Sequence, residues 1–61
     1  MSHAYFAHPT AVIDAGSKIG TGTKIWHFSH IMPGCTIGNY CTIGQNVVVS
    51  PDVVLGKNVK I

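Results

Sequence analysis

Residues 13–61 read IDAGSKIGTGTKIWHFSHIMPGCTIGNYCTIGQNVVVSPDVVLGKNVKI, and a branched aliphatic side chain returns at every sixth position of this stretch. The series is Ile13, Ile19, Ile25, Ile31, Ile37, Ile43, Val49, Leu55 and Ile61. A helix would send successive members to different faces, so no apolar stripe would form. A single strand of this length is rare. The period therefore predicts a chain that turns a corner every six residues and points one aliphatic side chain inward each time, a hexapeptide β-helix.

The remaining positions of the repeat support this prediction. If the aliphatic residue is position one, position five is small or β-branched throughout, from Ala11 to Val59. Positions five and one are two residues apart, so on an extended segment both side chains point inward. All seven glycines fall at positions two and four, and the three prolines at position three. Glycine permits positive φ and proline fixes φ, so positions two to four are predicted to form the corner.

Three corners close one coil, which gives the coil a period of eighteen residues. Gly20, Gly38 and Gly56 follow this spacing. We therefore expect an all-β chain: a parallel β-helix of about three 18-residue coils over residues 7–61, preceded by a lead-in of residues 1–6. Stacked coils should pair as parallel strands about 4.8 Å apart.

Composition excludes several classes of protein. The net charge of +2 and the few scattered lysines do not form the dense basic stripe of a nucleic-acid-binding surface. No apolar run is long enough to span a membrane, and residues 1–12 contain no apolar core segment. We therefore expect no signal peptide and a cytoplasmic location. Cys35 and Cys41 both occupy position five, and we expect them to be buried, reduced thiols. The chain stops on the inward residue Ile61, so we expect a longer solenoid or ends covered by partner chains.

One corner departs from the pattern. It reads Trp26-His27-Phe28, where other corners hold glycine, proline or asparagine, and outward His30 follows. Exposed aromatic clusters on a rigid wall are typical of interfaces and ligand sites. Trp26 and Phe28 fit either role. The two histidines fit either proton transfer or plain surface hydrogen bonding.

The coil period predicts the neighbours of this corner. His27 should lie beside Gln45, and Phe28 beside Asn46. His30 should lie between Val12 and Val48, and Pro9 and Thr10 should precede the corner by one coil. We expect no acidic partner near these histidines. A zinc site would need a third ligand from His3, His8 or another chain, so we expect no metal.

Two runs, AHPTAVID at residues 7–14 and KIWHFSHIMPG at residues 24–34, strongly resemble hexapeptide-repeat acyltransferases. The likeness covers nearly the whole chain. It is closest to bacterial enzymes that acetylate the 3-amino group of a UDP-linked 2-acetamido-3-amino-2,3-dideoxy sugar, often a glucuronate. Those enzymes serve surface-polysaccharide synthesis, such as that of the O-antigen of lipopolysaccharide.

The resemblance implies a left-handed β-helix that assembles as a homotrimer. It also implies that acetyl-CoA, the co-substrate, and a UDP-amino sugar bind in clefts between neighbouring solenoids. Later coils of such enzymes supply most of the acetyl-CoA site. We expect the substrate-binding residues present here to be Trp26, His27, Phe28, His30, Gln45 and Asn46, with His27 as the candidate catalytic base.

Two other functions remain open at this point. One is a metal enzyme on the same scaffold, similar to carbonic-anhydrase-like solenoids that use histidines from adjacent subunits. The other is a trimerising structural solenoid without activity. The acetyl-CoA-dependent sugar N-acetyltransferase is the leading interpretation, because it accounts for the aromatic corner as well as for the hexad.

Overall fold

A computed structural model describes residues 5–61, and these residues form nine short β-strands without a helix. The strands are β1 (Phe6–Ala7), β2 (Val12–Ile13), β3 (Lys18–Ile19), β4 (Lys24–Ile25), β5 (His30–Ile31), β6 (Thr36–Ile37), β7 (Thr42–Ile43), β8 (Val48–Val49) and β9 (Val54–Leu55). Residues 1–4 of the predicted lead-in lie outside the described residues, and Phe6 belongs to β1. Residues 5–61 therefore contain no helix that could span a membrane.

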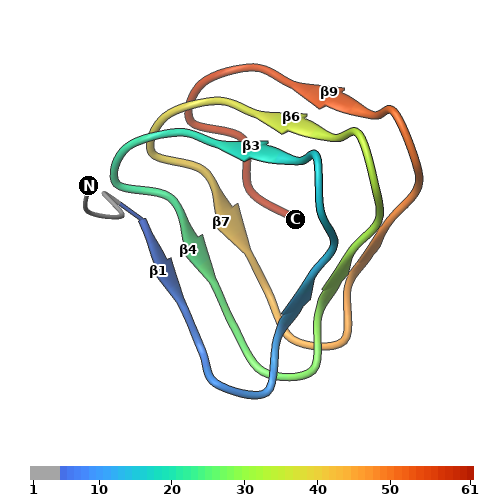
Figure 1. The fold of residues 1–61 in the computed structure, drawn as a ribbon. Coiled ribbons are helices and arrows are strands. Elements are labelled where there is room, and N and C mark those ends of the chain that lie inside the picture. The colour runs from blue at the N-terminus through green and yellow to red at the C-terminus, as the bar shows by residue number, and fades with distance from the viewer. Residues whose placement is uncertain (1–4) are drawn as a thin grey trace.

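The strands build three parallel sheets, each along one side of a triangular coil (Figure 1). Their orders are β1-β4-β7, β2-β5-β8 and β3-β6-β9. Each strand pairs in parallel with the strand eighteen residues further on, so Ile19 faces Ile37, which faces Leu55. The predicted stacking of the aliphatic series in columns is therefore confirmed.

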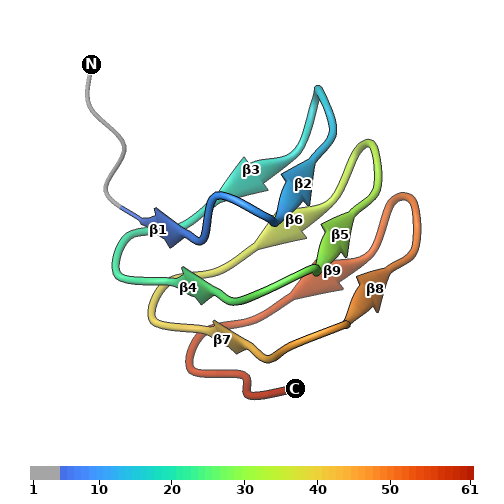
Figure 2. The ribbon, with the colours of Figure 1, turned by 90° about the horizontal axis from the view of Figure 1, so that it is seen from below.

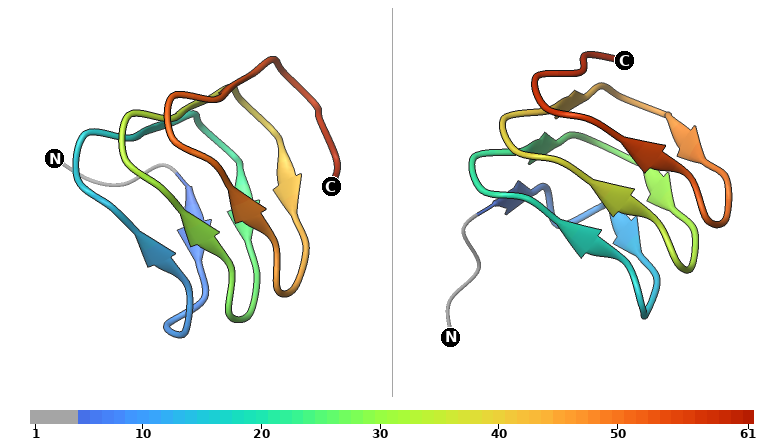
Figure 3. Two further views of the ribbon diagram at one scale, coloured as in Figure 1. Left: turned by 90° about the vertical axis from the view of Figure 1, so that its right-hand side faces the viewer. Right: turned by 90° about the horizontal axis from the view of Figure 1, so that it is seen from above.

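The coil is left-handed. In Figure 1 the chain runs anticlockwise from β1 through β2 to β3. Figures 2 and 3 show that the coils stack in sequence order along the axis, with β1 at the end nearest the viewer of Figure 1 and the C-terminus at the far end. A chain that recedes while turning anticlockwise winds to the left, as the resemblance implied.

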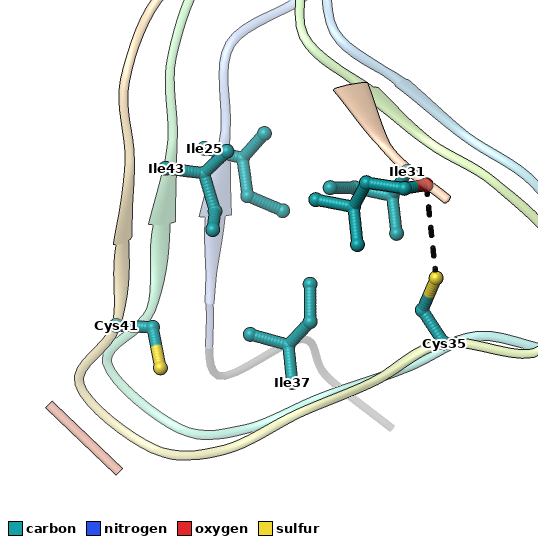
Figure 4. Close-up of a cluster of buried hydrophobic side chains, with 7 residues drawn as sticks. Ile25, Ile31, Cys35, Ile37, Cys41 and Ile43 are labelled. Atoms are coloured by element: carbon teal, nitrogen blue, oxygen red, sulfur yellow. Dashed lines mark hydrogen bonds between the residues drawn. The ribbon is translucent and has the colours of Figure 1, made fainter. Parts of the chain in front are cut away.

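The core is the inside of this coil. The middle members of the aliphatic series, Ile25, Ile31, Ile37 and Ile43, are at most 2% exposed. Figure 4 shows them converging from the three sides of the coil. The two cysteines are buried and free, as position five predicted.

Position five also contributes hydrogen bonds between coils. The Thr23 hydroxyl donates to the Gly38 carbonyl (2.7 Å) and accepts from the Cys41 N–H (3.1 Å). The side chains of Ser17, Ser29, Cys35 and Cys41 likewise donate to the carbonyl fifteen residues ahead. Buried backbone groups need such partners. The small polar residues of position five therefore stabilise the stack as well as fill it.

The corners turn through the left-handed region of φ. All eight position-four residues between residues 16 and 58 have φ from 56° to 84°. Most of them are glycine, asparagine or aspartate, which adopt this conformation most easily. Phe28 (φ 56°) and Tyr40 (φ 58°) are the exceptions. A bulky side chain there costs about 1 kcal/mol or more.

Candidate functional site

The candidate site is built on the turn between β4 and β5, at the lowest corner of the triangle in Figure 1. Trp26 and Phe6 contact each other with ring centroids 5.4 Å apart. The imidazole rings of His27 and His8 are stacked, 3.7 Å apart. Phe28 follows, 6.3 Å from His27. We call these five side chains the aromatic corner.

A short chain of hydrogen bonds holds His8 in place. The Phe28 N–H donates to the Thr10 hydroxyl (2.9 Å), and that hydroxyl lies 2.9 Å from Nδ1 of His8. The Thr10 N–H also donates to the same nitrogen (3.2 Å). Nδ1 of His8 is therefore an acceptor, so the neutral ring carries its proton on Nε2. This fixes the tautomer of the ring on which His27 is stacked.

His27 contains an unsatisfied polar atom. Its Nδ1 is buried and has no hydrogen-bond partner among the described residues. Leaving a buried polar group unpaired costs about 1–3 kcal/mol. Because Nδ1 is buried, Nε2 is the nitrogen of His27 that can exchange a proton with a ligand. An unpaired buried polar atom in a folded protein calls for an explanation, and a role in a ligand site is one such explanation.

The next coil adds Gln45 and Asn46 to the aromatic corner. The Asn46 N–H donates to the His27 carbonyl (3.0 Å), and both Gln45 and Asn46 are exposed. The predicted register is thus confirmed here. Together with Trp26, His27 and Phe28, five of the six predicted substrate-binding residues lie at one corner on two adjacent coils.

His30 lies apart from them, on the outer face of sheet β2–β5–β8. It stands between Val12 and Val48, as the period predicted. Its Nε2 is 2.7 Å from Oδ2 of Asp14, and both side chains are partly exposed. Our expectation of no acidic partner near the histidines is therefore wrong for His30. Positions two and six both point outward, so Asp14 is the diagonal neighbour of His30 on the adjacent coil.

Sequence reasoning missed three members of the local arrangement. Phe6 and His8 lie eighteen residues before Lys24 and Trp26, so counting back one coil would have placed both beside the corner. Asp14 could have been found by treating positions two and six of adjacent coils as neighbours.

The corner is an open surface. The described residues enclose no pocket, and no three His, Cys, Asp or Glu side chains among them come together in an arrangement that could hold a metal ion. A ligand on this corner would therefore be in contact with one wall of the described chain. Any second wall has to come from outside the described residues.

Comparison with known families decides the classification. The family model described as bacterial transferase hexapeptide (six repeats) matches residues 16–51, more than half of the chain. The chain belongs to this family. The six-residue repeat of this transferase family corresponds to the six-residue spacing of the strands in the structure.

Two curated relatives show which kinds of enzyme are similar in sequence to this chain. The chain is 45% identical over 38 residues to a dTDP-3-amino-3,6-dideoxy-α-D-galactopyranose 3-N-acetyltransferase of Aneurinibacillus thermoaerophilus. It is 41% identical over 34 residues to an acyl-acyl-carrier-protein–UDP-N-acetylglucosamine O-acyltransferase of Brucella ovis. These matches cover 62% and 56% of the chain, but only 19% and 12% of the relatives. Both relatives are acyltransferases, and the chain spans a small part of their length.

Proposed function

We propose that this chain forms part of an N-acetyltransferase that transfers acetyl from acetyl-CoA to the amino group of a UDP-linked amino sugar. The reaction would take place in the cytoplasm and serve bacterial surface-polysaccharide synthesis. The observation that carries the proposal is the aromatic corner, with its stacked histidines on a rigid coil. The similarity to a nucleotide-sugar 3-N-acetyltransferase supports this choice of reaction.

The corner offers the groups that this substrate requires. Trp26 and Phe28 provide faces for stacking on a base or a sugar ring. The side-chain amides of Gln45 and Asn46 can both donate and accept, which suits sugar hydroxyls. His30 would contact substrate only on the neighbouring face, where Asp14 orients its ring.

In the proposed reaction the neutral sugar amine attacks the thioester carbonyl of acetyl-CoA. A tetrahedral oxyanion forms and then collapses, breaking the C–S bond and releasing CoA thiolate. The amine proton passes to Nε2 of His27, or to the departing thiolate, and an amide remains. Holding both substrates against one rigid wall lowers the activation barrier, because the amine and the thioester are kept close together in a reactive orientation.

An open corner holds two substrates poorly, so we propose that the protein works as a homotrimer. A neighbouring copy would then provide the second wall of the cleft. The exclusion of water from such a cleft strengthens each polar contact in it.

A thiol-release assay tests the function. Purified protein is mixed with acetyl-CoA and a UDP- or dTDP-linked 3-amino sugar. The matched control is the same nucleotide sugar with a 3-hydroxyl group. We expect thiol release with the amine and none with the alcohol. Equal release with both, or acyl transfer only from an acyl carrier protein, would contradict an N-acetyltransferase.

A further inference from the structure

The three outer faces of the coil differ in charge. On the sheet β1–β4–β7, which forms the left side of Figure 1, the outward column is Phe6, Lys24, Thr42 and Lys60. Trp26 lies two residues beyond Lys24, where the alternation of an extended segment returns to the same face. This face therefore combines two amines with an aromatic pair.

No acidic group neutralises these amines. The chain has two acidic residues. Asp14 pairs with His30 on the sheet β2–β5–β8, and Asp52 lies over Gly34 at another corner. Among residues 5–61, neither Lys24 nor Lys60 forms an ion pair. The electrostatic potential of this face is therefore positive and attracts anions.

Aromatic residues in unfavourable backbone conformations flank the same face. Phe28 stands at the turn that leaves β4, and Tyr40 at the turn that leads into β7. They are 64% and 59% exposed, and both have positive φ. The Tyr40 ring lies over Gly22 and the Phe28 ring lies beside His27, yet backbone preference does not favour an aromatic residue at either turn. Such strain tends to occur where a side chain serves a site.

We propose that the face of sheet β1–β4–β7 binds the nucleoside diphosphate part of the substrate. The base stacks on the pair of Phe6 and Trp26, and the two phosphates contact Lys24 and Lys60. The nature of the ligand rests on the proposed function. The placement of its parts rests on the charges and rings of this face, and it assigns a role to lysines that the sequence alone left as surface groups.

The dimensions agree with this assignment. Two spacings of a parallel ladder put the backbones of Lys24 and Lys60 about 10 Å apart. Both side chains are exposed and have long flexible stems, so their amines can converge on one diphosphate. Trp26 lies about 6.6 Å from Lys24 along the chain, which places the base beside the phosphates.

The single tryptophan of the chain gives a direct test. Fluorescence of Trp26 in the purified protein is titrated with UDP and with dTDP, without acetyl-CoA. Lys24→Gln and Lys60→Gln are compared with Lys18→Gln, which removes a lysine from the outer face of β3. We expect quenching by both nucleotides. Affinity should fall about fourfold in each of the first two variants and stay unchanged in the third. The wild-type affinity should also fall with added salt.

Three results would overturn the proposal. One is the absence of quenching by either nucleotide. Another is an equal loss of affinity in Lys18→Gln, which would indicate attraction by net charge alone. The third is binding of a single-stranded oligonucleotide far more tightly than of UDP, which would indicate a nucleic-acid surface. The assay needs no acetyl transfer, so it tests the nucleotide site separately from the reaction. Nucleotide binding by a protein that acetylates the 3-hydroxyl sugar as well as the 3-amino sugar would contradict the proposed function and leave this site intact.

Discussion

The imidazole ring of His27 lies on the ring of His8, with centroids 3.7 Å apart and planes 29° from parallel. The two residues come from adjacent coils, so the stack forms only when the coils are in register. His8 is held by Thr10, and His27 places its Nδ1 in a buried position without a partner. The arrangement leaves one nitrogen of His27, Nε2, to meet a ligand.

We predict that His27→Ala lowers kcat/KM for acetyl transfer by about 10² or more, because a positioned general base contributes 10² to 10⁴. The thermal unfolding midpoint should change little, since the substitution also removes an unpaired buried nitrogen. His27→Phe, which keeps a ring on His8, is the matched control and should lose activity as well. If either variant has the kcat/KM of the wild type, His27 is not the general base.

The hydroxyl of Thr23 joins two coils through one donated and one accepted hydrogen bond. We predict that Thr23→Val lowers the free energy of unfolding by about 1–3 kcal/mol, because it leaves two backbone groups unpaired at nearly constant volume. Thr23→Ser keeps the hydroxyl and should cost clearly less. Urea denaturation followed by circular dichroism measures both, and equal losses would argue against the hydrogen bonds.

Phe28 occupies a left-handed corner position where its side chain is strained. We predict that Phe28→Asn raises the free energy of unfolding by about 1 kcal/mol, because asparagine tolerates this conformation better. The same change should weaken nucleotide-sugar binding, since an exposed stacking face is lost. A variant that is less stable than wild type would show that Phe28 is held for packing.

Gly22 and Gly56 offer a matched pair of tests. A Cβ on Gly22, which has φ 75°, would meet the ring of Tyr40, whereas a Cβ on Gly56 would meet nothing within 4 Å. We predict that Gly22→Ala costs about 2 kcal/mol or more and that Gly56→Ala is close to neutral. Adding Tyr40→Ala should recover the part of the loss due to the clash. Equal melting temperatures for the two alanine variants would contradict this geometry.

The sequence was sufficient to predict the architecture because one spacing governs every residue. Ile19, Ile37 and Leu55 stack as the period requires, and the position-five residues from Thr23 to Cys41 are buried for the same reason. The same arithmetic placed Gln45 beside His27 and Asn46 beside Phe28, and the hydrogen bond from the Asn46 N–H to the His27 carbonyl joins these two turns. The left-handed winding could be predicted only from the family resemblance, because the repeat and the composition do not determine the handedness of the coil.

Side-chain direction was the part that the sequence did not predict. The contact between His30 and Asp14 depends on two outward positions meeting diagonally across coils. The stacking of His8 on His27 depends on side-chain torsions, which residue spacing does not determine. His30 is near the corner in sequence, yet the turn after Phe28 carries it onto another face.

The central claim is that the aromatic corner contacts the nucleotide sugar. The most direct test is the amide and indole NMR spectrum of the labelled protein during titration with an unreactive UDP-sugar. We predict shifts of the Trp26 indole N–H and of the side-chain amides of Gln45 and Asn46, while Thr36 and Val54 on the β3–β6–β9 face stay unmoved. Shifts confined to that other face, or none at the corner at saturating ligand, would contradict the account.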